Sequence, residues 1–591
     1  MRSTKLTQVL VSFLMIFMII SSYSLANTLK ESRLIIVHTA NIYGDLTPTN
    51  YFTSNFEQKG AAYLVNYLRN LRTKYDSVLA IDTGNLLYGS PFGDYYLNVD
   101  NNPVLKIFNI LAYDFFIPGT FELGMSTEQL EKIVASLKPK TLAANLKGIK
   151  GAASYSIITL KNGVKVAVIG IVAENGNHSF VPYLDVAKRI VEDIRKNRRA
   201  DVVVIATSAG VKTSPATSNV RSLDSKFAFG DQLIKELSGS VDVFLFGNQS
   251  LTLVYSKNNK VYSLPPSNGR GLNQIELVLS RDAKGWKITR AQVKLVDFKM
   301  VTPDEVILEE LKNYEAELEK WLDEPVGSVP SNVPFHKYMA IIEDNPAIEF
   351  VARNLMKATQ ANLAVWNVFN PNFFGLSAGD LTRRTIYQLV GTVTTLKVLK
   401  IKGSELEKLL SQIFKYVKYE NGILVLSKEI LGSPWKVDLF EGVSYDLVIN
   451  KGVVRNVTVD NKPLEVNKEY MLVVPTVRTQ GADRIAYGKV IMEVEQPVSL
   501  IILNLLSSCD NEKVFTLDFN RRTLAELEYV VKPGDTLRQL EWRLGVPQWE
   551  IMQLNPFIKN PNLLRPGWKL IYYRSYLELV PPLQNFFIFN N

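Results

Sequence analysis

Cysteine and histidine are the scarcest chemically active residues in this sequence. Among 591 residues there is one cysteine, Cys509, and there are three histidines, His38, His178 and His336. A single cysteine excludes an intramolecular disulfide. We interpret Cys509 as a buried free thiol, because the surrounding SSCDN has no neighbouring histidine that would support a nucleophile. Three histidines also leave little material for a histidine-rich metal site.

Positive charge is in excess but is not concentrated anywhere in the chain. The formal net charge is +9, from 67 basic and 58 acidic residues, and no run of five lysines or arginines occurs. We therefore expect no nucleic-acid partner, which would need a basic patch or stripe. The composition, 47% hydrophobic and 21% charged, is that of a globular protein. At ~150 residues per domain, the length suggests about four domains.

Only one hydrophobic run stands out, and it lies at the N-terminus. Arg2 and Lys5 precede the apolar stretch LVSFLMIFMII (10–20), and SLA (24–26) places small residues at the spacing of a cleavage site. About eleven apolar residues are too few to span a bilayer comfortably. We predict a signal peptide over 1–26 that is removed on export, which leaves no transmembrane anchor. No cysteine lies near the cut, so no lipid anchor is expected.

The rest of the chain alternates between strand-like and helix-like stretches. Apolar runs such as VKVAVIGIVAE (164–174) and ADVVVIATSAG (200–210) are typical of buried sheet strands with loops at their ends. A charged helical stretch follows, and PVGSVPSNVPF (325–335) ends it. We expect a signal peptide (1–26), an α/β domain (27–301), a connector helix (302–325), an α+β domain (326–520), a β-α-α-β module (527–573), and a tail (574–591) that packs back onto a domain.

Polar motifs follow the strand-like runs of the first domain. They read HTANIYGDL (38–46), IDTGNLLYGSP (81–91), PGTFELG (118–124), ATSAG (206–210) and FGNQS (246–250). In order and spacing, residues 33–500 resemble the exported 5′-nucleotidase and UDP-sugar hydrolase family. The resemblance implies a calcineurin-like metallophosphoesterase α/β sandwich, joined by a connector helix to a 5′-nucleotidase C-terminal α+β domain. In that family the first domain holds metal and the second binds the nucleotide.

The resemblance assigns metal-binding or catalytic roles to eight positions, and each holds a different residue type here. In the family, these positions hold the metal-binding acids, histidines and asparagine and the catalytic histidine. In this sequence they fall on Asn41, Tyr43, Asn85, Thr120, Phe121, Ser208, Asn248 and Ser250. A dinuclear site needs a bridging carboxylate and imidazoles to offset the repulsion between two dications. We therefore expect no catalytic residue, no metal ligand and no cofactor.

Other acids and one histidine lie near these motifs but off the family's ligand positions. They are His38, Asp45, Asp82 and Glu122. We interpret Asp82 and Glu122 as structural residues at strand and loop ends. A single hard cation on these oxygens is the less favoured alternative.

The second domain departs from the family pattern in the same way. The family's Asn-x-Gly-Gly-Ile-Arg loop falls on NVFNPNFFG (367–375), and a nucleoside-stacking Phe falls on Val477. Phe373 and Phe374 could stack on a base, although core packing is the favoured reading. Four arginines could bind the phosphate of a small phosphorylated ligand, although we favour the interpretation that they are ordinary charged surface residues. They are Arg383, Arg384, Arg478 and Arg484.

The last module resembles a LysM domain. VKPGDTLRQLEWRLGV (531–546) and LNPFIKNPNLLRPGWKLIYY (554–573) carry its Gly-Asp-Thr-Leu opening and its Asn-Pro and Pro-Gly-x-x-Leu close. LysM modules bind N-acetylglucosamine polymers, chiefly peptidoglycan, in a groove between two loops. That groove maps onto Gly534, Asp535, Thr536, Leu537, Asn555, Pro556, Ile558, Leu563 and Leu564. Gly534 and Asp535 have an alternative role in the turn and the helix cap.

Together these features favour an exported, cell-wall-associated protein of the periplasm or envelope, whose large domains bind or scaffold rather than catalyse. The alternative is a phosphate-ester hydrolase of nucleotide catabolism with altered metal ligands. A wall-cleaving amidase or muramidase is a third option, for which the sequence has no signature.

Overall fold

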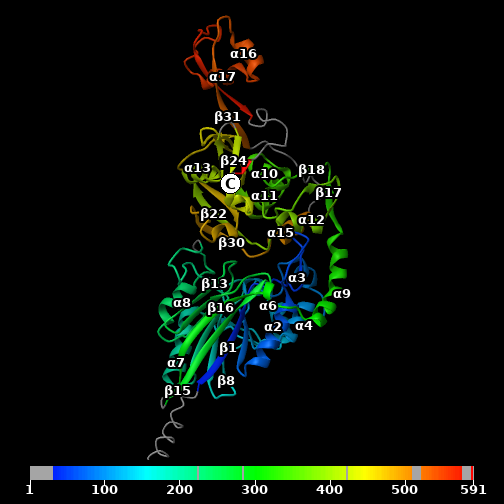
Figure 1. Cartoon of the computed structure of the whole chain (residues 1–591), viewed down its shortest axis with the longest axis vertical. Coiled ribbons are helices and arrows are strands. Elements are labelled where there is room, and N and C mark those ends of the chain that lie inside the picture. The colour runs from blue at the N-terminus through cyan, green and yellow to red at the C-terminus, as the bar shows by residue number, and fades with distance from the viewer. Residues whose placement is uncertain are drawn as a thin grey trace, which may run out of the picture.

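The computed structural model describes residues 31–176, 178–222, 225–282, 285–420, 423–508, 521–575 and 588–589. The expected signal peptide, Cys509 and most of the tail lie outside these residues. The described chain forms an elongated molecule with the first domain at one end and the C-terminal module at the other (Figure 1). No helix in the described part is long and apolar enough to cross a membrane. The mixed α/β, multidomain architecture expected from the sequence is confirmed.

Two six-stranded sheets form the first domain. One has the order β16-β15-β1-β4-β5-β6 and the other β13-β14-β12-β11-β9-β8. The strands of the first sheet are β1 (Glu31–Thr39), β4 (Val78–Asp82), β5 (Phe115–Phe116), β6 (Lys140–Thr141), β15 (Gly271–Asp282) and β16 (Gly285–Asp297). Those of the second are β8 (Tyr155–Thr159), β9 (Lys165–Ile171), β11 (Val202–Thr207), β12 (Val243–Leu245), β13 (Leu253–Lys257) and β14 (Lys260–Leu264).

The two sheets pack face to face, and helices cover their outer faces. Ile36 and Ile81 of one sheet share a buried cluster with Val168 and Val204 of the other. This packing explains the nearly continuous apolar runs, because both faces of these strands are buried. The helices of this domain are α2 (Ala61–Lys74), α3 (Pro91–Tyr96), α4 (Pro103–Ile110), α5 (Thr120–Leu123), α6 (Thr127–Ser136), α7 (Tyr183–Lys196) and α8 (Gly230–Leu237).

A single helix, α9 (Glu305–Leu322), runs along one side of the molecule from the first large domain to the second (Figure 1). Asp304 caps it, accepting a hydrogen bond from the Ile307 amide at 3.2 Å. Its apolar residues Leu311 and Leu318 join the core of the first domain. The sequence placed this connector at 302–325, so the helix lies inside the expected segment.

The second domain is built on a five-stranded sheet of order β25-β19-β29-β22-β30. Alternate residues of β19 (Leu363–Trp366) face opposite sides: Val365 joins one buried cluster and Trp366 the other. Its other strands are β22 (Leu396–Lys402), β25 (Leu439–Glu441), β29 (Glu469–Pro475) and β30 (Lys489–Val494). The main helices are α11 (Pro346–Thr359), α12 (Arg383–Val390), α13 (Gly403–Leu410) and α15 (Val498–Ser508).

The two large domains are joined by direct contacts as well as by α9. The Tyr387 hydroxyl donates to Asp94 at 2.7 Å, and the Asn370 side chain donates to the Phe52 carbonyl at 2.8 Å. On the opposite side of the junction, the Gly481 amide donates to the Arg221 carbonyl at 2.7 Å.

The C-terminal module continues a sheet of the second domain. Strand β31 (Arg521–Val530) pairs in parallel with β26 (Val443–Val448) through residues 521–524 and antiparallel with β32 (Lys569–Ser575) through residues 524–530. Helices α16 (Leu537–Leu544) and α17 (Gln548–Leu554) complete the expected β-α-α-β order. In the tail, β33 (Ile588–Phe589) pairs with β24 (Ile423–Leu426), as expected for a tail that packs back.

Candidate functional site

Four of the eight positions singled out from the sequence have left-handed backbone conformations. Their φ angles are 55° for Asn41, 58° for Tyr43, 55° for Asn85 and 51° for Asn248. Asparagine tolerates this region better than other non-glycine residues, whereas a bulky tyrosine is strained there. The strand-end loops therefore keep a demanding backbone geometry, and asparagine occupies three of these four positions.

Asn85 is the centre of a buried hydrogen-bond network. Its side-chain nitrogen donates to Oδ1 of Asn41 at 3.0 Å and to Oδ1 of Asn248 at 3.2 Å. Its own Oδ1 accepts from the Phe121 amide at 3.0 Å. The Thr120 hydroxyl lies 3.4 Å from the same oxygen. The structure thus brings together residues from four loops that are far apart in the sequence.

Glu495, just beyond β30 of the second domain, reaches into this network. The Thr120 hydroxyl lies 3.0 Å from Oε2 of Glu495 and 3.2 Å from Oδ1 of Asn248. A hydroxyl has one proton, so these acceptors compete for it, and the carboxylate is the nearest. Burial, followed by repulsion from Glu493, raises the pKa of Glu495 to about 7. No sequence signal pointed to Glu495, because it lies 375 residues from Thr120.

Aromatic rings fill the space next to the amide network. The ring of Phe121 is buried, with its centroid 5.2 Å from that of Tyr43 and 5.1 Å from that of Tyr88. Gly89 lies against this cluster, where a Cβ atom would come within 3.0 Å of Phe121 and 3.1 Å of Tyr43. Burial, with a smaller contribution from Glu495, raises the pKa of Tyr43, which stays neutral. Phe121, the position at which the resemblance predicts the catalytic histidine, has no group that transfers a proton.

The two remaining positions do not join the network through hydrogen bonds of the described residues. Ser208 is buried and accepts from the Ala173 amide at 3.0 Å. Ser250 is exposed. Six of the eight positions are therefore gathered at one place, where hydrogen bonds join Asn41, Asn85, Thr120 and Asn248, and the rings of Tyr43 and Phe121 pack together.

His38 lies in the core between the two sheets rather than at the network. Its ring nitrogens lie 2.8 Å from the Ser263 hydroxyl and 2.9 Å from the Thr83 hydroxyl. Burial lowers the pKa of His38 to about 3, so the ring is neutral. Asp82 is also buried: it accepts from the Thr39 hydroxyl at 2.6 Å and from the Gly84 amide at 2.9 Å. Burial raises the pKa of Asp82 to about 8.

Glu122 shapes the loop that follows β4. Its two carboxylate oxygens accept from the backbone amides of residues 85, 86, 87 and 119, at 2.9, 2.8, 3.2 and 2.8 Å. Burial raises its pKa, while these four backbone hydrogen bonds lower it. The carboxylate thereby stabilises the left-handed turn at Asn85.

The donors at this place do not suit a dinuclear metal centre. Asn41, Asn85, Asn248 and Thr120 offer neutral amide and hydroxyl oxygens that already satisfy one another, whereas divalent pairs require anionic bridging ligands. Within the described ranges, no group of three or more His, Cys, Asp or Glu side chains is arranged to hold a metal.

The four arginines considered for phosphate binding are held by neighbouring groups. Arg383 pairs with Glu324 at 2.6 Å, and Arg384 pairs with Asp323 at 2.7 Å, so both bind the end of α9. Arg478 is buried against Asp438 at 2.7 Å. Arg484 donates to backbone carbonyls, at 3.1 Å to Gly481 and 3.3 Å to Val220. Phe373 is buried in the core and Phe374 is exposed.

The nine predicted LysM groove residues divide between the module's core and its surface. Leu537 and Ile558 are buried in the core, and the buried Asn555 side chain donates to the Ile571 carbonyl at 2.7 Å. Asp535 accepts from Tyr529 at 2.7 Å and Arg543 at 2.9 Å, while Thr536 caps α16. Gly534, Pro556 and Leu563 are exposed and Leu564 is half-buried. The glycan-binding role of this set stays a prediction.

Two parts of the chain match known domain families. Residues 327–489 match the 5′-nucleotidase C-terminal domain, and residues 529–571 match the LysM domain. The chain carries a 5′-nucleotidase C-terminal domain and a LysM domain. The sequence-based recognition of both domains is thus confirmed, and the LysM domain suggests association with the cell wall.

The relatives of this 5′-nucleotidase-like chain are nucleotide phosphoesterases. It is 21% identical over 548 residues to the trifunctional nucleotide phosphoesterase YfkN of Bacillus subtilis, covering 78% of this chain and 37% of that protein. It is 21% identical over 535 residues to the 2′,3′-cyclic-nucleotide 2′-phosphodiesterase/3′-nucleotidase of Salmonella typhimurium, covering 76% of this chain and 81% of that protein. The chain therefore spans little more than a third of YfkN.

Solved structures share the fold. A candidate 5′-nucleotidase from Staphylococcus aureus superposes with a TM-score of 0.60 at 18% identity, covering 83% of this chain and all of that one. The NAD nucleotidase of Haemophilus influenzae superposes with a TM-score of 0.56 at 16% identity, covering 84% of this chain and 99% of that one. At these identities the likeness shows the fold and not the activity.

Proposed function

We propose that this chain is an exported, non-catalytic binding or scaffold protein, held at the cell wall by its LysM domain. The observation that carries the proposal is the network of Asn41, Asn85, Asn248 and Thr120, where the resemblance expects metal ligands. Its donors and acceptors are used internally, and a neutral donor set of this kind would bind two dications poorly.

The position of the catalytic histidine supports the same proposal. General acid catalysis needs a side chain that delivers a proton to the leaving group. Phe121 has no proton to give, and burial raises the pKa of the nearby Tyr43, so its hydroxyl is a weaker acid than an exposed phenol. In the second domain, the ion pairs of Arg383, Arg384 and Arg478 reduce their availability to a phosphate.

Hydrolysis assays test the absence of catalysis. Purified mature protein is incubated with AMP, UDP-glucose and p-nitrophenyl phosphate in the presence of Mn²⁺, Co²⁺ or Zn²⁺. We expect no turnover above a heat-treated control. Robust turnover that a chelator abolishes would contradict the proposal.

The alternative is a hydrolase with altered ligands, active on nucleotides or another phosphate ester. It is favoured by the relatives, which are named as phosphoesterases, and by the retained left-handed loops. Metal content separates the two functions. Stoichiometric, tightly bound metal in the purified protein favours the hydrolase, and metal far below one equivalent favours the non-catalytic protein.

Wall attachment is tested in the full-length chain. Truncation before the LysM domain is unsuitable, because a cut near residue 525 falls inside β31 and removes β32, the antiparallel partner of β31. We instead replace the exposed loop residues Pro556 and Leu563 with arginine. Retention on insoluble peptidoglycan should fall about tenfold, because two bulky charges would obstruct the expected groove. Equal retention of both proteins would argue against attachment through this groove.

A further inference from the structure

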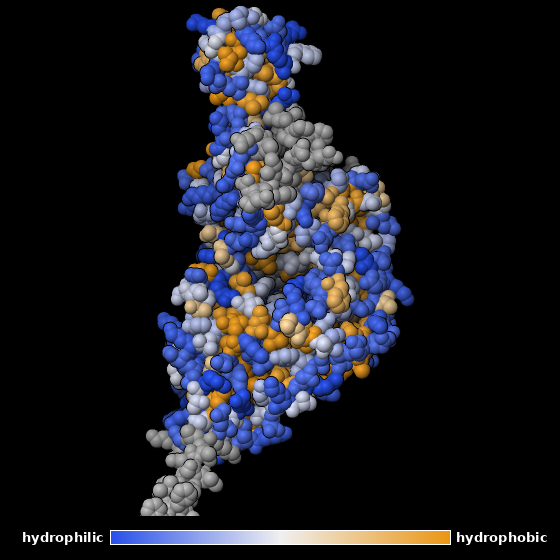
Figure 2. Space-filling model, viewed as in Figure 1, coloured by the Kyte–Doolittle hydropathy of each residue, from blue (hydrophilic) through white to orange (hydrophobic). Residues whose placement is uncertain are grey.

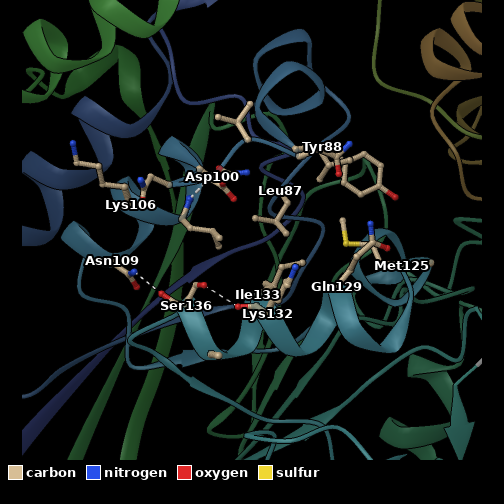
Figure 3. A pocket seen from close by; sticks show the side chains of 18 of the residues that line it. Leu87, Tyr88, Asp100, Lys106, Asn109, Met125, Gln129, Lys132, Ile133 and Ser136 are labelled. Carbon is tan, nitrogen blue, oxygen red and sulfur yellow. Dashed lines mark hydrogen bonds between the residues drawn. The ribbon is translucent and has the colours of Figure 1, made fainter.

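A large cleft lies where the two large domains meet. It has a volume of about 1360 Å³ and is lined by α4 and α6 of the first domain, Tyr314 of α9, and residues 495, 496 and 500 of the second domain. Figure 2 shows the surface hollowed at the domain junction, and Figure 3 shows the side chains that line the cleft. Sites for single small molecules usually measure ~300–1,000 Å³, so this cleft suits an extended ligand of several linked units.

Among the described residues, the lining of the cleft has no unopposed positive charge. Its two lysines each lie near a carboxylate: Lys106 is 2.6 Å from Glu310, and Lys132 is 4.0 Å from Glu128. Two acidic residues, Asp100 and Glu495, also line it. A phosphate-bearing ligand would need unopposed positive charge. The cleft therefore favours a ligand with no net charge.

Amide side chains supply the polar contacts. Asn98, Asn101 and Gln496 line the cleft, and their side chains make no hydrogen bond with other residues of the described chain. A primary amide both donates and accepts, so it matches hydroxyl and acetamido groups, which do the same.

A fixed aromatic ring forms part of the wall. The hydroxyl of Tyr88 donates to the Phe121 carbonyl at 3.1 Å, and its ring packs 5.1 Å from that of Phe121. The half-buried ring lies beside Leu87 at the edge of the cleft (Figure 3). An aromatic ring held in one orientation offers an apolar face to a sugar ring at low entropic cost.

We propose that this cleft binds a neutral, N-acetylated glycan segment, so that one chain holds wall polymer at two separate sites. Extended shape, the lack of unopposed positive charge among the described lining residues, free amides and a fixed tyrosine ring are the features such a ligand requires. The proposal rests on the wall attachment proposed above, because the LysM domain would bring the polymer to the cleft. Two linked sites retain a polymer better than either alone.

Titration of the full-length protein with N-acetylglucosamine hexamer tests the proposal. The background carries the Pro556→Arg and Leu563→Arg substitutions, so that binding reports the cleft. Ala135→Trp fills the cleft from an exposed position on α6. Its matched control is Glu192→Trp, exposed on α7 and outside the cleft. We expect about tenfold weaker hexamer binding with Ala135→Trp and no change with the control.

A second variant checks the chemistry without filling the space. Gln496→Leu keeps the side-chain size and removes the amide, so hexamer binding should again weaken while the unfolding midpoint stays constant. Equal hexamer binding by Ala135→Trp and Glu192→Trp overturns the cleft proposal. So does displacement of the hexamer by AMP, which would assign the cleft to a phosphorylated ligand. Weaker retention on peptidoglycan without a change in hexamer binding by the cleft would concern the LysM domain only. The cleft proposal and the wall-attachment proposal can therefore fail independently.

Discussion

At the scale of single residues, three asparagines hold the strand-end loops in a left-handed backbone conformation. Asn41, Asn85 and Asn248 have positive φ angles and bond one another through their side chains. Asparagine combines tolerance of the left-handed conformation with a side chain that both donates and accepts. It therefore stabilises these turns without a cation.

Reintroducing a carboxylate at the centre of this network should destabilise the protein. In Asn85→Asp, the new oxygen would face Oδ1 of Asn41 and Oδ1 of Asn248, both of which are acceptors. We expect a loss of about 2–4 kcal/mol in the free energy of unfolding at neutral pH, from urea titrations. The loss should shrink near pH 5, because a buried carboxylate is protonated there.

The matched control for this substitution is Asn268→Asp. Asn268 is also left-handed, at φ 60°, but its side chain is only half-buried. It should change the free energy of unfolding by less than about 0.5 kcal/mol. Full recovery of the stability of Asn85→Asp by added Mn²⁺ would show that the surrounding groups hold a metal once a carboxylate is present.

At the scale of elements, the sequence predicted the β-α-α-β order of the last module but not how β31 is shared. The motif YVV at 529–531 indicated a LysM strand, whereas β31 begins at Arg521 and first pairs with β26. Alternation of apolar residues reports burial and not the partner strand, so this pairing could not be read from the sequence. Residues 521–526 fall between the two domains expected from the sequence, whereas they belong to β31 in the structure.

The continuous strand should couple the LysM domain to the second domain. Asn450 holds the junction with two hydrogen bonds, donating to the Glu526 carbonyl at 2.7 Å and accepting from the Glu526 amide at 3.0 Å. Asn450→Ala removes both. We expect about tenfold faster hydrogen exchange at the Ile449 and Glu526 amides.

The control for the junction is Lys462→Ala, at the far edge of the same sheet. It should leave exchange at the junction unchanged. Equal exchange in Asn450→Ala and the wild-type protein would show that pairing with β26 alone holds the LysM domain in place.

At the scale of the whole molecule, six of the eight positions singled out from the sequence lie together, but the sequence could not show what covers them. Glu495 comes from the second domain, and its contact with Thr120 depends on how the two domains are docked. Local sequence patterns carry no information on how the two domains dock, because a carboxylate on the surface and one between two domains have the same local sequence pattern. The same limit concealed the ion pairs of Arg383 and Arg384 with the connector helix.

Glu495 should make the stability of the domain junction depend on pH. Its folded-state pKa of about 7 lies above the ordinary value of 4.5, because burial and Glu493 disfavour the charged form. The folded state then holds a proton that the unfolded chain has lost between these two values. The contribution of Glu495 to stability is therefore greatest below about pH 4.5 and falls as the pH rises to about 7, by about 3 kcal/mol at most.

Glu495→Gln removes this titration while its amide oxygen can still accept from the Thr120 hydroxyl. Urea midpoints between pH 4.5 and 8.5 should therefore fall less steeply in the variant than in the wild-type protein. Glu465→Gln, at an exposed position, should keep the wild-type slope. Lys397 and Lys226 also face Glu495 and favour its charged form, whereas burial disfavours it. The difference in slope between the variant and the wild-type protein therefore measures the net effect of the two lysines and of burial. Parallel slopes for Glu495→Gln and the wild-type protein would mean that Glu495 is solvated at the junction and does not seal the network beneath it.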